Sequence, residues 1–244
     1  MRHCAKRGNV KKLRTQTLSE RKKEDNMKKK ILFLIPNLKH GGAEKVLVNL
    51  VNNMDHSKFD ITVMALFGGG VNEQFLAPHI RYISCFKHMI PGNSHLMKLL
   101  TPKQLHKWLI KDKYDIEISY LEGPSVRIIS GCPYKNTKLI SWIHCTMNSN
   151  EDIARSFRSA AEAAQGYGKM DAMVFVSKTN RDAFLSVCPY SGRIEVLYNT
   201  NESNQIITLA QEDTRLPKDA FCWCGVGKLL PSKGFDRMIR IQKR

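Results

Sequence analysis

A basic glycine loop near the end of the chain has the residue types of a phosphate site. The segment Val226–Arg237 combines strand-forming residues, a loop with Gly227 and Gly234, and the start of a helix. Such a turn presents backbone N–H groups and lysines to a phosphate at a helix N-terminus. We therefore predict that Lys228 and Lys233 bind phosphate, although similar loops are also common as plain turns.

A second glycine loop follows the first apolar run of the chain. Residues 30–36, KILFLIP, read as a buried strand, and Asn37, Gly41 and Gly42 precede an amphipathic helix over 43–53. Glycine allows close approach of the backbone to a ligand, and the helix dipole favours an anion at this point. The sequence thus indicates a second phosphate-binding loop, with a tight turn that binds nothing as the alternative.

Two further polar residues stand where predicted strands end. His144 follows the apolar run Leu139–Ile143, and Glu122 follows the run that ends at Tyr120. The carboxyl ends of parallel strands meet at one edge of a sheet, where ligands bind. We expect Asn37, Glu122 and His144 to share a site there. A structural histidine and a carboxylate at the next helix N-terminus remain the alternatives.

The elements that position these residues alternate between strands and helices. Predicted strands span 31–35, 61–66, 81–84, 116–120, 139–143, 172–176 and 195–198, and predicted helices span 43–53, 124–130, 152–165 and 178–187. This alternation indicates an α/β fold with a doubly wound parallel Rossmann-like sheet. A further strand over 221–227 would begin a second Rossmann-like domain.

The two glycine loops, in this order and about 185 residues apart, resemble the family 4 retaining glycosyltransferases of the GT-B fold over residues 28–244. The resemblance implies transfer of a sugar from a nucleotide sugar. Gly41, Gly42, Lys228 and Lys233 would then bind the donor phosphates, and His144 would face the reacting sugar. The family usually has Arg where Lys228 stands, and Lys lacks the bidentate fork. Asn37 and Glu122 would lie on the acceptor side.

The same resemblance divides the chain into four parts. These are a basic tail (1–27), a GT-B N-terminal acceptor-side domain (28–200), a linker (201–218) and the start of the nucleotide-sugar-binding C-terminal domain (219–244). The donor ribose and sugar sites of the family would belong beyond Arg244, so we expect little activity from this chain alone. Alternatives are a non-catalytic acceptor- or membrane-binding subunit, with a separate donor-domain subunit, and a degenerate remnant.

The composition limits which binding partners and which cellular location we expect. The net charge is +17, and more than half of it falls in residues 1–30. No aromatic residues accompany these charges, so nucleic acid is not expected as a partner. The seven cysteines lack metal-ligand spacing, and their odd number favours reduced thiols in the cytoplasm. No Asp-x-Asp site stands at a suitable position, so we expect neither metal nor cofactor, only the nucleotide-diphosphate sugar as substrate.

A basic amphipathic segment, Leu96–Lys111, could bind a membrane surface. Thr101 and Pro102 are typical of a helix start, and Leu105, Trp108 and Leu109 form an apolar stripe beside several lysines. Such a helix suits inner-leaflet anionic lipids, although it could equally pack on the sheet with a solvated basic face. Together with the resemblance, this predicts a peripheral enzyme that glycosylates a lipid-linked saccharide in surface polysaccharide biosynthesis.

Overall fold

Seven parallel strands form one sheet in the computed structural model, which describes residues 28–88, 97–212, 221–227 and 229–242. Lys228, Leu96 and the basic tail 1–27 lie outside the described residues. The chain divides into two units, Met1–Asn201 and Glu202–Arg244, and the sheet belongs to the first.

The sheet confirms the predicted doubly wound α/β fold. Its order is β3-β2-β1-β4-β5-β6-β7, so the winding reverses between β1 and its parallel neighbour β4. Crevices at the carboxyl ends of strands, at such a reversal, are where open α/β sheets bind ligands. The strands are β1 (Lys29–Asn37), β2 (Phe59–Phe67), β3 (Arg81–Phe86), β4 (Ile116–Ser119), β5 (Lys138–Ile143), β6 (Ala172–Phe175) and β7 (Arg193–Val196).

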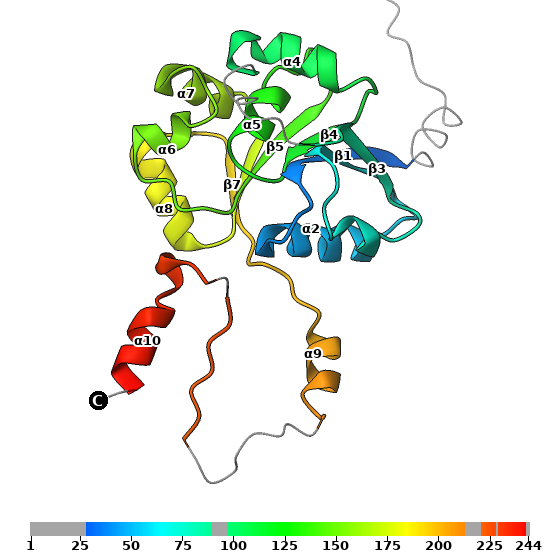
Figure 1. Cartoon of the computed structure of the whole chain (residues 1–244). Coiled ribbons are helices and arrows are strands. Elements are labelled where there is room, and N and C mark those ends of the chain that lie inside the picture. The colour runs from blue at the N-terminus through cyan, green and yellow to red at the C-terminus, as the bar shows by residue number, and fades with distance from the viewer. Residues whose placement is uncertain (1–27, 89–96, 213–220, 228, 243–244) are drawn as a thin grey trace, which may run out of the picture. The chain divides into compact units, whose positions relative to one another are not determined.

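Helices cover both faces of the sheet (Figure 1). On one face lies α2 (Gly42–Asn53), and the short helix η1 (Glu73–Phe75) precedes β3. The other face packs against α4 (Pro102–Leu109), α5 (Pro124–Ile129), α6 (Asn150–Ala154), α7 (Ala160–Gly168) and α8 (Lys178–Val187). The chain moves across the sheet in opposite directions on the two sides of β1, so right-handed crossovers place the helices on opposite faces of the sheet.

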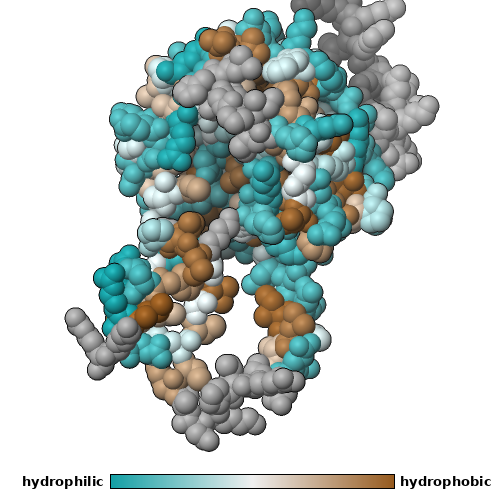
Figure 2. Space-filling view, viewed as in Figure 1, coloured by the Kyte–Doolittle hydropathy of each residue, from teal (hydrophilic) through white to brown (hydrophobic). Residues whose placement is uncertain are grey.

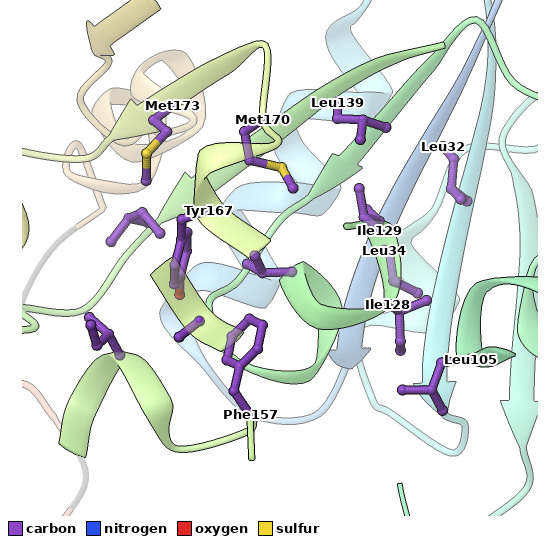
Figure 3. Packing of buried hydrophobic residues seen from close by; sticks show 14 of the residues in the cluster. Leu32, Leu34, Leu105, Ile128, Ile129, Leu139, Phe157, Tyr167, Met170 and Met173 are labelled. Carbon is purple, nitrogen blue, oxygen red and sulfur yellow. The ribbon is translucent and has the colours of Figure 1, made fainter. Parts of the chain in front are cut away.

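The core consists of two apolar layers that share the strands. In β1, Leu32 and Leu34 belong to the layer under α4 and α5, whereas Phe33 and Ile35 belong to the layer under α2. Figure 3 shows the first layer, in which Ile128 and Leu105 approach Leu34. A strand buried on both faces reads as a continuous apolar run, which is why β1 is recognisable from sequence. Full burial of each such side chain stabilises the fold by about 1.5–3 kcal/mol.

The single helix predicted over residues 152–165 is wrong in detail, because the structure has two helices there. Ser149 caps α6, and the Ser159 hydroxyl accepts a hydrogen bond from the backbone N–H of Glu162 to cap α7. Between the helices, Phe157 turns inward and is only 1% exposed. A serine cap followed three residues later by Glu is a helix-start pattern, and here it outweighs the helical periodicity that runs through it.

The predicted start of α4 is confirmed. Thr101 and Gln104 form a reciprocal capping box, and Pro102 is the first helical residue. The predicted apolar stripe, however, does not lie on a free surface. Leu105 is fully buried and Leu109 packs against the same core, while Trp108 remains 46% exposed. The main part of the stripe therefore holds α4 on the sheet.

The second unit contains α9 (Ser203–Leu209), η2 (Pro231–Lys233) and α10 (Phe235–Gln242). The predicted strand over 221–227 is wrong, because these residues have no regular secondary structure. A strand needs a hydrogen-bonded neighbour, and none pairs with them in the part of the chain that the structure describes. Apolar side chains gather on the surface of this unit (Figure 2), with Phe221 84% and Val226 93% exposed. Among the described residues, no helix is both long and apolar enough to span a membrane.

Candidate functional site

The loop between β1 and α2 is held in place by the loop that follows β2. The backbone N–H of Asn72 donates to the carbonyl of Leu38 (2.9 Å), and its side-chain amide donates to the carbonyl of Lys39 (2.6 Å). A Cβ atom at Gly70 would collide with the backbone of Leu38, so the two loops touch at a position that only glycine fits. The path of the chain from Asn37 to Gly41 is therefore fixed by residues more than thirty positions away.

The N-terminus of α2 carries its own carboxylate. Gly41 is the extended N-cap residue, and a Cβ atom on it would collide with the carboxylate of Glu44. By contrast, a Cβ atom on Gly42 would meet nothing within 4 Å. Glu44 thus sits where the helix dipole favours negative charge, and the open side of this loop is at Gly42. Asn37, at the end of β1, accepts a hydrogen bond from the Lys39 backbone (3.0 Å).

Two side chains from neighbouring elements hold the exit of β5. The carboxylate of Glu122 accepts a hydrogen bond from the backbone N–H of His144 (3.0 Å). The Asn180 amide donates to the carbonyl of His144 (3.0 Å), and its oxygen accepts from the Thr146 hydroxyl (3.1 Å). Glu122 therefore positions the loop that carries His144, which brings together two of the predicted site residues.

The imidazole of His144 packs in an aromatic cluster on the α2 face of the sheet. Its ring centroid lies 4.7 Å from that of Tyr120, and Trp142 completes the group at 5.1 Å from Tyr120. Nε2 of His144, the Tyr120 hydroxyl and Nε1 of Trp142 are buried without hydrogen-bond partners among the described residues. Burial lowers the pKa of His144, and the nearby charge of Glu122 opposes that effect only in part. His144 is therefore a neutral hydrogen-bonding group near pH 7.

The next residue, Cys145, links this exit to the start of α2. Burial raises the pKa of Cys145 to about 12, and a hydrogen bond to Glu122 and the charges of Glu122 and Glu44 add to the rise. The α2 N-terminus and the β5 exit both lie at the carboxyl edge of the sheet, because β1 and β5 are parallel strands of that sheet. The thiol stays protonated at neutral pH and is not a nucleophile.

The predicted phosphate lysines belong to the second unit, where only Lys233 is described. Lys233 ends η2 and is exposed, and Gly234 follows it with a left-handed φ of 69° before α10 begins. A Cβ atom on Gly227 would lie 3.6 Å from Cγ of Lys233, so the glycine loop folds against this turn. The expected order of glycine loop, lysine and helix start is present, although a strand does not precede it.

Two residues of this region were not predicted as site residues. Asn72 and Asn180 hold the two loops through side-chain hydrogen bonds, and neither stands at the end of a predicted strand. Asn180 has one local signal, since Ser177 caps α8 and accepts from the Asn180 backbone. Nothing in the sequence near Asn72 indicates its contacts.

The fold and this site define an α/β domain whose candidate ligand residues lie at the carboxyl edge of the sheet, around the reversal of winding. Comparison with known families shows which domain it is. The model for Glycosyltransferase Family 4 matches residues 40–200, well over half of the chain. The chain belongs to Glycosyltransferase Family 4.

Solved structures give more distant matches. The N-terminal domain of Candida albicans trehalose-6-phosphate phosphatase has a TM-score of 0.50 at 10% identity, and the match covers 72% of this chain and 51% of that one. Anabaena HepE, solved in complex with UDP and glucose, has a TM-score of 0.45 at 18% identity, covering 75% and 50%. The chain thus spans about half the length of each. None of the curated proteins matches it.

Proposed function

We propose that this protein is the acceptor-side part of a retaining glycosyltransferase that moves a hexosyl group from a nucleotide sugar to a saccharide acceptor. One observation carries the proposal beyond family membership. The loop of Gly41 and Gly42 at the α2 N-terminus follows β1, and the exit that carries His144 follows β5, so both lie at the carboxyl edge of the parallel sheet.

The residues of this edge divide the work as follows. A neutral His144 donates a hydrogen bond to a sugar hydroxyl or accepts one from it, while Glu122 and Asn180 hold its backbone in place. Asn37 and Glu122 border the acceptor. The open backbone at Gly42 is one phosphate-binding element of the proposal. Lys228 and Lys233, which belong to the second unit, are the other proposed phosphate-binding residues, because their charge would stabilise a departing diphosphate. A neutral imidazole suits this role because it adds no charge beside the reacting sugar.

The donor part of the proposal is tested by calorimetric titration of the full chain with UDP and other nucleoside diphosphates. We expect micromolar binding that Lys233→Ala weakens at least tenfold. The matched control is Lys58→Ala, which removes an exposed lysine that pairs with Asp55 in the loop before β2. Absence of binding at millimolar nucleotide would refute the donor site and favour a non-catalytic acceptor-binding subunit.

The acceptor part is tested by calorimetric titration of the full chain with lipid-linked saccharides, because we expect little transfer from this chain alone. Loss of saccharide binding in His144→Ala, with the circular dichroism spectrum unchanged, would support the assigned role. Glu122→Gln keeps an acceptor for the His144 N–H and should retain more affinity for the saccharide than Glu122→Ala. Equal affinity of both Glu122 variants and the wild type would contradict the positioning role of this carboxylate.

A lipid-linked acceptor also requires contact with a membrane, and one surface favours it. Leu99 is 73% exposed and Trp108 is 46% exposed, and both lie in a segment with Lys98, Lys103 and Lys107. Arg158 donates hydrogen bonds to the carbonyls of Lys98 and Leu99, and these bonds tie this part of the segment to the domain. Exposed apolar side chains beside lysines suit the surface of anionic lipids.

Sedimentation with vesicles of phosphatidylglycerol tests this surface. Leu99→Ser should reduce binding several-fold, and added salt should weaken it by screening the lysines. Val71→Ser is the matched control, because Val71 is an exposed apolar residue (40%) outside this segment. Equal binding by the two variants would remove the proposed membrane contact while leaving the sugar-transfer proposal standing.

A further inference from the structure

A second group of chemically active side chains lies inside the domain, apart from the carboxyl edge of the sheet. His106 of α4, Glu117 of β4 and Cys132, which follows α5, meet under the helical face. Nε2 of His106 lies 2.9 Å from Oε2 and 3.1 Å from Oε1 of Glu117, and Sγ of Cys132 lies 3.5 Å from Oε1. The three ligand atoms all lie within 4.8 Å of one another.

The burial of this group calls for a cation. The side chain of Glu117 is 0% exposed and that of His106 is 2% exposed. A carboxylate in a dry interior is costly unless a positive group and hydrogen bonds compensate it. The hydrogen bond between Nε2 of His106 and the Glu117 carboxylate provides part of this compensation. A metal ion bound by the same three side chains would provide another, with neutral imidazole and thiolate as ligands.

We propose that His106, Glu117 and Cys132 form a binding site for a divalent transition metal ion of the zinc class. One nitrogen, one oxygen and one sulfur ligand form a set that zinc accepts with tetrahedral geometry. Bond lengths of about 2.0–2.3 Å place neighbouring ligands of a tetrahedral zinc ion roughly 3.3–3.6 Å apart. Measured to the same oxygen, Oε1 of Glu117, the separations are 3.1 Å from Nε2 of His106 and 3.5 Å from Sγ of Cys132, which are close to these values. The nitrogen and the sulfur lie within 4.8 Å of each other, so they must move closer together to complete the site.

A pocket of about 310 Å³ adjoins His106 and is also lined by Lys103, Lys107, Lys111 and Tyr134. The ring of Tyr134 meets the imidazole edge-on, with 6.3 Å between the ring centroids. Glu117 and Cys132 do not line this pocket and the His106 side chain is only 2% exposed, so the pocket reaches only the His106 edge of the group. The fourth coordination position is left to water or a small anion that binds with the metal.

Metal binding here exchanges protons for the ion. The Cys132 thiol loses its proton on forming the sulfur–metal bond, and the His106–Glu117 pair gives up any proton on Nε2 so that the nitrogen lone pair can bind.

The test is titration of the untagged full chain with Co²⁺, followed by Zn²⁺ competition against a chromophoric chelator. One Co²⁺ per chain should give a thiolate-to-cobalt charge-transfer band and the intense visible bands of a tetrahedral ion. Cys132→Ser should abolish the charge-transfer band. His106→Gln should weaken Zn²⁺ binding more than about 100-fold, because even loss of an outer-shell partner costs roughly 10- to 100-fold. Circular dichroism establishes that each variant is folded.

The exposed Cys222 and Cys224 provide the control, because they are other thiols that could bind the ion. The double variant Cys222→Ser/Cys224→Ser should keep full affinity and the charge-transfer band. Loss of the signal in this variant would overturn the proposal, as would the absence of stoichiometric binding by wild-type protein. Retention of the charge-transfer band in folded Cys132→Ser would overturn it equally. A rise in melting temperature with Zn²⁺ that requires Cys132 would support it independently.

Discussion

Replacement of Arg127 by Met should destabilise the first unit more than any exposed charge substitution. Arg127 is 1% exposed, and its guanidinium binds three groups, two in the segment before α4 and one in α7. Nη1 donates to the Met97 carbonyl and Nη2 to the Leu100 carbonyl, both at 2.7 Å. Nη2 also donates to Oε1 of Glu162 at 3.1 Å. Methionine fills similar volume but supplies none of these hydrogen bonds.

The structure sets the size of the effect. Removal of one partner from a buried ion pair costs about 3–5 kcal/mol. Glu162 is 19% exposed and keeps a hydrogen bond from the Arg158 backbone, which reduces the loss. The two carbonyls lose a charged donor, at about 1–3 kcal/mol for each one that stays unsatisfied. We therefore expect at least about 4 kcal/mol, which corresponds to a fall of at least roughly 8–16 °C in Tm for a unit of this size.

Urea unfolding followed by circular dichroism measures this change, with the slope m expected to stay constant. The control is Arg181→Met, because Arg181 pairs with Asp182 on the surface, where such pairs contribute about 0–1 kcal/mol. The double variant Arg127→Met/Glu162→Gln should lose less stability than the sum of the two single variants, because no carboxylate is then left without its partner. If Arg127→Met costs no more than Arg181→Met, the buried network does not hold the segment before α4 and the reasoning is refuted.

Three further predictions concern the loops, the histidine and the second unit. Gly123→Ala should lower the free energy of urea unfolding by about 1–3 kcal/mol, because Gly123 has a φ of 88° and the Ser156 hydroxyl lies 2.9 Å from the added methyl group. Gly42→Ala should leave it nearly unchanged, because the added methyl group meets nothing within 4 Å. The pKa of His144, followed by NMR, should lie below its ordinary value, and it should fall further in Glu122→Gln, which removes the charge that raises it. Because the imidazole binds a proton less readily in the folded than in the unfolded protein, the free energy of unfolding should increase with pH through about 6.5. A value at or above the ordinary one would contradict the burial described. Hydrogen exchange should be fast over residues 221–227 and slow in β1, and equal protection of the two would contradict the open second unit.

The sheet was predictable because its physical cause is local. A strand buried on both faces needs a run of apolar residues, and Lys30–Ile35 shows that run directly. Loop residues follow each run, so the carboxyl edge could be named before the structure was known. The meeting of Glu122 and His144 follows from that rule alone. The two helices on either side of Ser159 could also have been predicted, because the spacing of Ser159 and Glu162 is a local signal of a helix start.

The features that the sequence did not predict correctly depend on residues far away in the chain. The residues around Trp223 alternate like a strand, but alternation cannot form a strand without a neighbour to pair with. Asn72 and Asn180 reach across 33 and 36 positions to carbonyls of the site loops. A polar side chain that satisfies a remote carbonyl has no pattern of its own. These contacts become visible only when the fold brings the loops together.

The chemistry of His144 depends on tertiary structure in the same way. A histidine at a strand exit is compatible with a base, a cation or a hydrogen-bonding group, and the sequence does not choose between them. The aromatic rings of Tyr120 and Trp142 remove water from the imidazole, and burial then disfavours its charged form. Glu122 opposes this effect, but it is also engaged with the backbone N–H of His144. Packing therefore favours a neutral imidazole, which suits the proposed role of orienting a hydroxyl better than a role that needs charge.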